Sequence, residues 1–257
     1  MAELYKESKE ILDILEKDMD IVEHSVIFDD ELEDSEFLEE VERNKAHPVY
    51  LVVSQYKSAI QKPIEFFTKS EWSHACLSFS SKLTSLYSYN GAARNTLSGS
   101  KKGGFSRESI EKYKEVMPDN RLQVNVVFLN NHEYKIFKDR IKYLENNAGS
   151  TKYNFKGLIA VLLNKPNNKM SNNMICSQFV DSLFKLIDSS LIDKTSNLVT
   201  PKDIGELKSR KIYKVFDGKI KDYKASEVKK KITKLYNSEK TKYLTENTFI
   251  DEFIDIN

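Results

Sequence analysis

The sequence predicts an α+β fold, in which an antiparallel sheet packs against helices and a charged helical segment lies at each end of the chain. Three observations lead to this class. Short β-branched and aromatic segments alternate with helical periodicities in the middle of the chain. The two ends carry opposite charge. The 257 residues are 40% hydrophobic and 31% charged, with 8 Gly and 5 Pro, as in a globular protein rather than a fibrous or low-complexity one.

Residues 1–46 form the acidic end and are predicted to be helical. Residues 1–45 hold 17 acidic and 5 basic residues. Apolar positions recur at helical spacing in two sets, which predicts two helices: Leu4, Ile11, Ile14, Leu15, Met19 and Ile21, then Leu32, Phe37, Leu38 and Val41. Two interpretations remain open, namely solvated helix faces packed on the main body and a charged docking surface for a protein partner.

Residues 47–217 carry the strands and the candidate chemistry. The strands are predicted from runs of β-branched and aromatic residues, the helices from apolar spacing of three and four, and the last helix from Thr200 as N-cap followed by Pro201. In chain order we expect a strand at Pro48–Tyr56, a helix at Ser58–Thr68, strands at Ser73–Ser80 and Leu83–Tyr89, a loop at Gly91–Gly104, a strand at Leu122–Leu129, a helix at Tyr134–Asn146, mixed helix and loop at 149–173, a helix at Met174–Ile187 and a helix from Pro201.

Residues 218–257 form the basic end, and Val228, Ile232 and Leu235 predict one more helix there, which could fold back on the acidic end. Residues 205–242 hold 13 basic and 5 acidic residues. The lysines are interrupted by acidic residues and no aromatic platform accompanies them, so we expect a solvated helix face and no nucleic-acid binding.

Composition excludes several further classes of protein. The 40 basic and 39 acidic residues nearly cancel, which gives no general attraction to nucleic acid or to an anionic membrane. Two cysteines are too few for a disulfide framework, and we expect no disulfide, metal or cofactor. The first residues are acidic, unlike a secretory signal, and no apolar run is long enough to cross a bilayer. A soluble protein without a signal peptide is expected.

Cys176 is the first candidate for chemistry because it lies where a thiol can be activated. Phe179, Val180, Leu183, Phe184 and Ile187 form the apolar stripe of a helix, which places Cys176 in its first turn. Unpaired N–H groups and the positive end of the helix dipole favour a thiolate there. The alternative is a small buried hydrophobic residue. Cys76, inside a predicted strand, lacks such assistance and is interpreted as packing.

His74 is the candidate base among four histidines. His24, His47 and His132 lie in an acidic helix or in charged turns and are expected to be exposed. His74 instead opens a strand in which His74, Cys76 and Ser78 share one face and apolar residues share the other. The alternative role is that of a hydrogen-bonded core histidine.

These residues resemble the circularly permuted papain-like hydrolases of the NlpC type. The segment Ser58–Phe79 is similar to their helix, T-x-S-x-[YW]-S-H turn and strand, and the histidine precedes the cysteine as in that family. Further segments are similar to a subgroup found in Firmicutes and their phages: Leu86–Asn90, Gly103–Phe105, Tyr153–Phe155, Cys176–Val180 and Leu198–Asp203. The resemblance covers about residues 48–217 and implies a permuted papain-like fold, with the sheet packed against the helix that carries the cysteine.

The resemblance also implies roles for individual residues. Cys176 would be the nucleophile and His74 its general base. The family uses a third polar group from the next strand to orient the imidazole. That strand offers no carboxylate here, so Ser88 is taken for this role.

The function expected from the resemblance is that of a thiol hydrolase, an amidase or peptidase that forms an acyl-enzyme on a peptide or amide substrate, with cell-wall peptides as the first choice. The alternative is a phage tail, baseplate or other assembly protein that keeps the fold as a scaffold. The protein would accordingly be cytoplasmic or virion-associated. The two functions differ in the geometry that they require, because an enzyme needs the Cys176 sulfur near a His74 ring nitrogen.

Overall fold

The framework of the protein is a six-stranded antiparallel sheet with the strand order β4-β3-β2-β1-β5-β8. The computed structural model describes residues 46–55, 70–91, 103–154, 156–158, 173–187, 192, 194, 198–207 and 212–237. The strands of the sheet are β1 (His47–Ser54), β2 (His74–Ser78), β3 (Leu86–Asn90), β4 (Gly104–Glu108), β5 (Arg121–Leu129) and β8 (Ile212–Lys219). A separate parallel pair joins β6 (Lys152–Tyr153) to β7 (Asn173–Met174). The predicted α+β class with an antiparallel sheet is confirmed.

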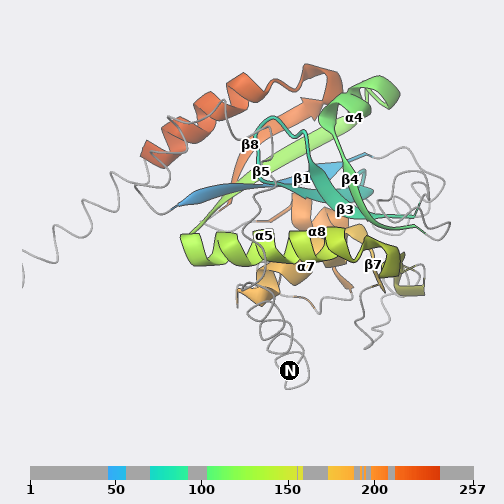
Figure 1. Cartoon of the computed structure of the whole chain (residues 1–257). Helices are drawn as coiled ribbons and strands as arrows, with labels where there is room; N and C mark the ends of the chain where they lie inside the picture. The colour runs from blue at the N-terminus through green and yellow to red at the C-terminus, as the bar shows by residue number, and fades with distance from the viewer. Residues whose placement is uncertain are drawn as a thin grey trace, which may run out of the picture.

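Helices cover both faces of the sheet (Figure 1). On one face pack α5 (Asn131–Asn146), α7 (Cys176–Leu186) and α8 (Pro201–Gly205). On the other pack α4 (Ile110–Val116), the short 3-10 helix η5 (Ile220–Asp222) and the helical residues 225–237. The sheet is therefore the middle of three layers, and its central strands have two buried faces.

The sequence of β1 follows from this position. Val49, Leu51 and Val53 face the α7 side, whereas Tyr50 and Val52 face the α4 side. Because alternate side chains of a strand point to opposite faces, a strand that is covered on both sides reads as a continuous apolar run. β2 pairs with β1 so that His74 lies opposite Ser54 and Cys76 opposite Val52. His74 and Cys76 accordingly share the face expected from the sequence.

Several boundaries differ from the sequence prediction. The turn expected around Asn130–Glu133 is the first turn of α5, because the Asn130 side chain accepts from the Glu133 N–H at 2.9 Å and the Glu133 carboxylate accepts from the Asn130 N–H at 3.0 Å. Met174 lies in β7 rather than in the cysteine helix. β4, α4 and β8 were not predicted. The helices expected at 1–46 and 58–68 fall outside the described residues.

The start of α8 agrees with the sequence in detail. Thr200 is the N-cap and Pro201 the first helical residue, and the Thr200 hydroxyl accepts from the Asp203 N–H at 3.2 Å. The Asp203 carboxylate accepts in return from the Thr200 N–H at 2.9 Å. This capping box fixes the chain just after Val199, which is one of the contacts of α7.

The basic C-terminal helix is joined closely to the sheet. The sequence predicts that the central domain ends at residue 217 and the basic end begins at 218. This boundary falls inside β8, which pairs with β5. Within the helical residues 225–237, Val228 and Ile232 are buried against the α4 side of the sheet. Among the described residues, every helix is too short or too polar to cross a membrane.

Candidate active site

Cys176 is the first residue of α7, so it lies in the first turn as the sequence predicts, although the helix begins two residues later than expected. Ile175 is the N-cap, and the Gln178 side-chain oxygen accepts from the Ile175 N–H at 3.2 Å. As at any helix start, the N–H groups of the first turn have no intrahelical acceptors, so their partial positive charge gathers there. The thiol of Cys176 thus lies in an environment that favours a negative sulfur.

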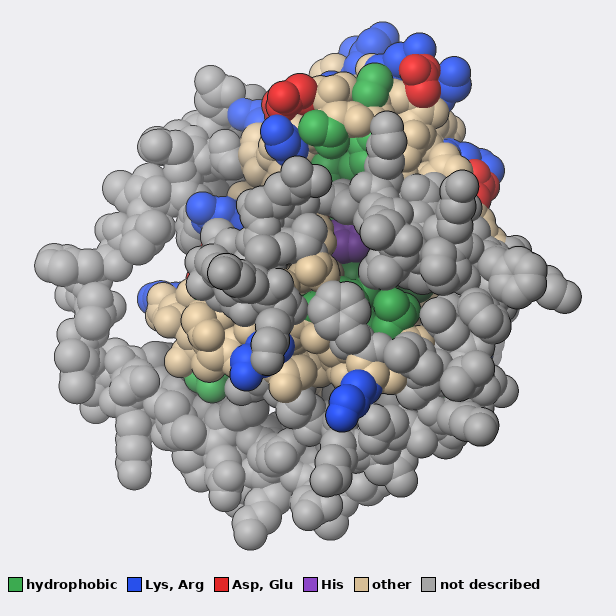
Figure 2. Space-filling view, turned by 90° about the vertical axis from the view of Figure 1, so that its right-hand side faces the viewer, with side chains coloured by type: hydrophobic (Ala, Val, Ile, Leu, Met, Phe, Trp, Pro, Cys, Tyr) green, Lys and Arg blue, Asp and Glu red, His purple; other side chains and the backbone are tan. Residues whose placement is uncertain are grey.

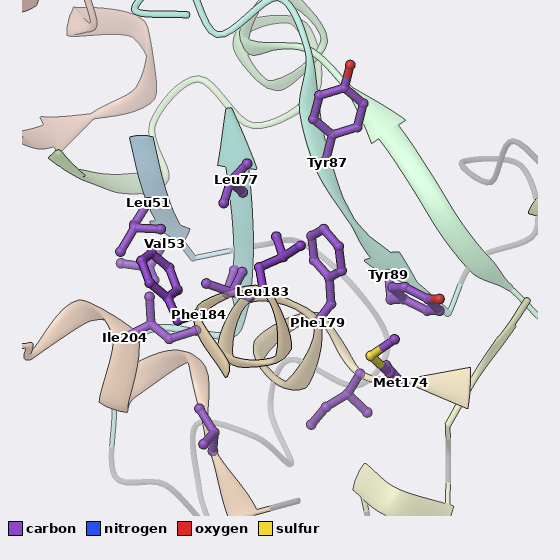
Figure 3. Packing of buried hydrophobic residues seen from close by; sticks show 14 of the residues in the cluster. Leu51, Val53, Leu77, Tyr87, Tyr89, Met174, Phe179, Leu183, Phe184 and Ile204 are labelled. Atoms are coloured by element: carbon purple, nitrogen blue, oxygen red, sulfur yellow. The ribbon is translucent and has the colours of Figure 1, made fainter. Parts of the chain in front are cut away.

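The helix that carries Cys176 is held by aromatic and aliphatic packing. Phe179, Leu183 and Phe184 point from α7 into the sheet (Figure 3), where Phe179 lies next to Tyr89 of β3. The Phe179 ring is 5.8 Å from that of Tyr89 and 5.6 Å from that of Phe105 of β4. These contacts set the position of the helix start relative to β3 and β4.

A hydrogen bond fixes the other side of the first turn. The Ser177 hydroxyl donates to the Val199 carbonyl at 2.6 Å. Because Thr200 begins the capping box of α8, the first turn of α7 is tied to a segment that is itself firmly placed. The Cys176 backbone therefore has little freedom to move.

His74 lies at the start of β2 and is brought to Cys176 by the packing of α7 on the sheet. The side chain of Cys176 lies near enough to the imidazole to raise the pKa of His74. Cys176 and His74 keep only 3% and 5% of their surface exposed. Figure 2 shows a histidine side chain set back behind the surrounding atoms on one face of the molecule, beside hydrophobic side chains. The structure thus joins the two candidates that the sequence identified.

Glu108, at the end of β4, faces the same imidazole and was missed in the sequence. Its Oε2 atom lies 3.7 Å from Nε2 of His74, and its side chain is buried. The Tyr113 hydroxyl of α4 donates to Oε2 at 2.9 Å, and the Asn90 amide of β3 donates to Oε1 at 3.4 Å. The carboxylate is therefore held in place by two donors from different elements.

Ser88, the residue expected to orient the imidazole, makes a different contact. Its hydroxyl donates to the Ala75 carbonyl at 2.6 Å, across the β2–β3 pair. This bond links two strands and uses the hydroxyl proton. β3, the strand next to His74, carries no carboxylate. The carboxylate that faces His74 is that of Glu108 on β4, the neighbour of β3 in the sheet. A signal for β4 was present, since Phe105 and Arg107 alternate with Ser106 and Glu108.

The electrostatics of the site favour a charged imidazole. Burial by itself lowers the pKa of His74, but the neighbouring side chains of Cys76, Cys176 and Glu108 outweigh that effect. The pKa of His74 therefore lies well above its ordinary value of 6.5. At neutral pH the imidazolium is the dominant form, which stabilises a thiolate beside it.

Two further buried groups adjoin the pair. Cys76 packs in the core on the α4 side, as expected, and its sulfur also lies 3.4 Å from the Tyr113 hydroxyl. Tyr153 of β6 is buried; burial first and the neighbouring Cys176 second raise its pKa, while His74 opposes this rise. Tyr153 consequently remains protonated, so that it can donate a hydrogen bond close to Cys176.

The remaining histidines lie in other environments. His132 is exposed, as predicted, and His24 falls outside the described residues. His47 is half-buried rather than exposed, because its ring stacks on Tyr134 at 4.3 Å and Nε2 lies 2.6 Å from Oδ1 of Asn131. In the described part of the chain, no group of three or more His, Cys, Asp or Glu side chains has an arrangement that could hold a metal ion.

No family model and no curated protein matches this chain. The contacts among Cys176, His74 and Glu108 are accordingly the observations from which a function has to be argued.

Proposed function

We propose that the protein is a thiol hydrolase, an amidase or peptidase, in which Cys176 is the nucleophile, His74 the general acid and base, and Glu108 the group that orients His74. The observation that carries the proposal is the closeness of Cys176 and His74 at the start of α7, where the side chain of Cys176 raises the pKa of His74. Nucleophilic catalysis needs a nucleophile, a base and a group that orients the base. A thiol, then an imidazole, then a buried carboxylate supply these three roles here.

The reaction begins with attack of the Cys176 thiolate on the carbonyl carbon of an amide. The new C–S bond forms as the carbonyl π electrons move to oxygen, and the first-turn N–H groups of α7 are donors to that oxyanion. When the C–N bond breaks, the His74 imidazolium gives its proton to the leaving amine. The product of this half-reaction is a thioester on Cys176 and a neutral imidazole.

Water completes the cycle. The neutral imidazole of His74 takes a proton from a water molecule as the water oxygen attacks the thioester carbon. Cleavage of the C–S bond then releases the carboxylic acid product and restores the thiolate beside an imidazolium. Glu108 keeps the ring in one orientation, since its carboxylate faces Nε2.

The substrate class proposed for this reaction is a peptide of the bacterial cell wall. This choice rests on the resemblance to the NlpC-type hydrolases of residues 48–217, and above all on the segments around His74 and Cys176. Papain-like chemistry fits any amide that reaches the sulfur, so the neighbouring side chains have to supply the selectivity.

A second candidate function is that of an assembly protein, such as a phage tail or baseplate component, which keeps the fold as a scaffold. The near-complete burial of both Cys176 and His74 favours it, because a substrate has to reach the sulfur. This candidate requires no activated thiol. The two functions therefore differ in the reactivity expected of Cys176.

Alkylation by iodoacetamide at pH 7, followed residue by residue with peptide mass spectrometry, tests the proposal. Cys176 should react about tenfold faster than Cys76 or more, because only a thiolate reacts at a useful rate. His74→Ala should remove the difference, and His132→Ala, a change at an exposed histidine, should leave it intact. Equal rates at the two cysteines in the unchanged protein would support the scaffold function instead.

A further inference from the structure

Tyr113 of α4 binds the carboxylate oxygen that faces His74. Its hydroxyl donates to Oε2 of Glu108 at 2.9 Å. The same Oε2 atom lies 3.7 Å from Nε2 of His74, which is longer than a hydrogen bond between these two atoms. The other donor to the carboxylate, the Asn90 amide, lies 3.4 Å from Oε1. Tyr113 and His74 therefore face one oxygen, and Tyr113 is the nearer of the two.

The chain gives Tyr113 little freedom to release this oxygen. Glu108 ends β4, and α4 begins two residues later with Ser109 as its N-cap. The Ile110 N–H donates to the Leu83 carbonyl at 3.0 Å, which ties the helix start to the segment before β3. The Tyr113 side chain itself is buried. The carboxylate and the hydroxyl are thus placed by one short, capped connection between β4 and α4.

The Cys76 thiol also contacts the Tyr113 hydroxyl. Its Sγ atom lies 3.4 Å from the phenol oxygen. A phenol has one proton, and Tyr113 gives this proton to Glu108, so the thiol is the donor in its contact with Tyr113. The donors therefore run from Cys76 through Tyr113 to the carboxylate. Each bond in such a chain polarises the next, which strengthens the bond that holds Oε2.

Several titratable side chains act on the charge of His74. Burial lowers the pKa of His74, whereas Cys76 of the same strand, Cys176 of α7 and Glu108 of β4 raise it. Tyr153 of β6 interacts with the charge of His74 as well. Because Tyr113 holds the Glu108 carboxylate, a change at Tyr113 reaches His74 through that group.

The proposed reaction sets an upper limit on the pKa of His74. The imidazolium gives a proton to the leaving amine, and the neutral imidazole then takes one from water, so neither form can be held too tightly. A carboxylate in a direct hydrogen bond with the imidazolium would raise the pKa of His74 further. At 3.7 Å, Oε2 keeps its charge near the ring without that bond.

We propose that Tyr113 is a positioning residue of the active site, whose hydroxyl, supported by the Cys76 thiol, holds Oε2 of Glu108 away from direct contact with His74. The imidazole is thereby kept able to act as a base. The inference rests on the proposed function and deepens it, because it names the residue that controls the pH range in which the thioester on Cys176 is hydrolysed.

NMR titration of the His74 ring signals in the full chain tests this role without any activity measurement. Tyr113→Phe should raise the pKa of His74 by about one pKa unit, because the released carboxylate moves onto the imidazolium and forms a charge-assisted hydrogen bond. An unchanged or lower pKa would refute the role. Tyr223→Phe is the matched control, since Tyr223 is buried on the same α4 side and donates to the Ser81 carbonyl. An equal rise in the control would assign the effect to general loosening.

Two further variants test whether the effect passes through the carboxylate. In a Glu108→Gln background, Tyr113→Phe should leave the pKa of His74 unchanged, because no carboxylate remains to move. A rise as large as in the unchanged background would contradict the proposal. If Tyr113→Phe does not fold, 3-fluorotyrosine in place of Tyr113 keeps the ring and the hydroxyl. As a stronger donor it should lower the pKa of His74, and an unchanged or raised pKa would refute the role.

A final measurement distinguishes failure of this role from failure of the proposed function. The Cys176 thiolate should displace p-nitrophenolate from p-nitrophenyl acetate, and water should then convert the thioacetate to acetate, which intact-protein mass spectrometry follows. In Tyr113→Phe, the pH at which this hydrolysis reaches half its maximal rate should rise with the pKa of His74. A rise in that pKa without a change in the hydrolysis profile would overturn the link to the reaction. If Cys176 is not acetylated in the unchanged protein while Tyr113→Phe still raises the pKa of His74, the hydrolase function fails and the hold of Tyr113 on Glu108 stands.

Discussion

At the scale of single residues, the protein is defined by a histidine that is placed between a thiol and a carboxylate. The Cys176 thiol and Glu108 both contact the imidazole of His74, and Tyr113 and Asn90 hold Glu108 in turn. Buried charges of this kind are tolerated when each one has partners. The network therefore has to act as a unit, and changes within it should affect both reactivity and stability.

Glu108→Gln should lower the pKa of His74 and slow alkylation of Cys176 about tenfold at neutral pH. The carboxylate stabilises the imidazolium, and a loss of one pKa unit changes the population of that form tenfold. NMR titration of the His74 ring signals and the alkylation rate check the two effects. Ser88→Ala is the matched control, since the Ser88 hydroxyl bonds the Ala75 carbonyl. A loss of reactivity in Ser88→Ala but not in Glu108→Gln would restore Ser88 as the orienting group.

The raised pKa of His74 also predicts how stability depends on pH. Because the folded state binds the proton more tightly than the unfolded chain, the contribution to stability is complete below about pH 6.5 and is lost as the pH rises through the folded-state pKa. The free energy of unfolding should fall over that range by at most about 1.4 kcal/mol per pH unit. Urea titrations at several pH values measure this slope, and His74→Gln should remove it. An unchanged slope in His74→Gln would assign the dependence to other groups.

At the scale of elements, an aromatic cluster joins the cysteine helix to the edge of the sheet. Phe179 of α7 contacts Tyr89 of β3 and Phe105 of β4, the strand that ends at Glu108. His74 and Cys76 share the face of the sheet toward α4, whereas α7 packs on the other face. Glu108 and Cys176 therefore approach His74 from opposite faces. The packing of α7 on β3 and β4 consequently sets the distance between the thiol and the imidazole.

Phe179→Ala should destabilise the fold by about 3–5 kcal/mol, because it removes a buried ring and leaves a cavity. Equilibrium unfolding in urea gives the value. Val116→Ala, a change at a hydrophobic side chain that is 48% exposed, is the control and should alter stability by less than about 0.5 kcal/mol. A cost for Phe179→Ala no larger than that of the control would show that α7 is not anchored through this cluster.

At the scale of the whole molecule, the sheet is covered on both faces and the basic C-terminal helix forms part of the covering layer. Tyr223, Val228 and Ile232 are buried on the α4 side, and the Tyr223 hydroxyl donates to the Ser81 carbonyl at 2.5 Å. Lys230 and Lys234 are exposed on the opposite side of the helix, as in an amphipathic surface helix, whereas Lys231 donates to the Val215 carbonyl of β8 at 2.9 Å. The second face of the sheet thus depends on residues beyond β8.

Ile232→Ala should cost about 2–5 kcal/mol of stability, since the side chain is fully buried between the helix and the sheet. Lys230→Ala on the exposed side of the same helix is the matched control and should be nearly neutral. Thermal and urea unfolding of both variants compare them directly. Equal, small effects would mean that the helix is an appendage rather than a structural layer.

The features that the sequence predicts correctly are those that depend on residues close together in the chain. The N-cap of α8 at Thr200, the start of α7 at Cys176 and the faces of β2 were all predictable, because they depend on residues within one turn or one strand. Asn130 shows the limit of this approach, since its polar neighbourhood is typical of a turn as well as of a capped helix start. β8 was missed because it is an edge strand whose side chains are mostly half-buried, with lysine, aspartate and glycine among its apolar residues, so the apolar signal is weak.

The sequence by itself determined the fold class, the antiparallel strands around His74 and the helical position of Cys176, because local periodicity and capping specify these features. Only the tertiary structure decided that Glu108 faces His74 and that Cys176 lies near the same imidazole. These contacts join residues that are distant in the chain, through the strand order of the sheet and the packing of α7 on it. No local pattern encodes such contacts, because they depend on how whole elements are placed against one another.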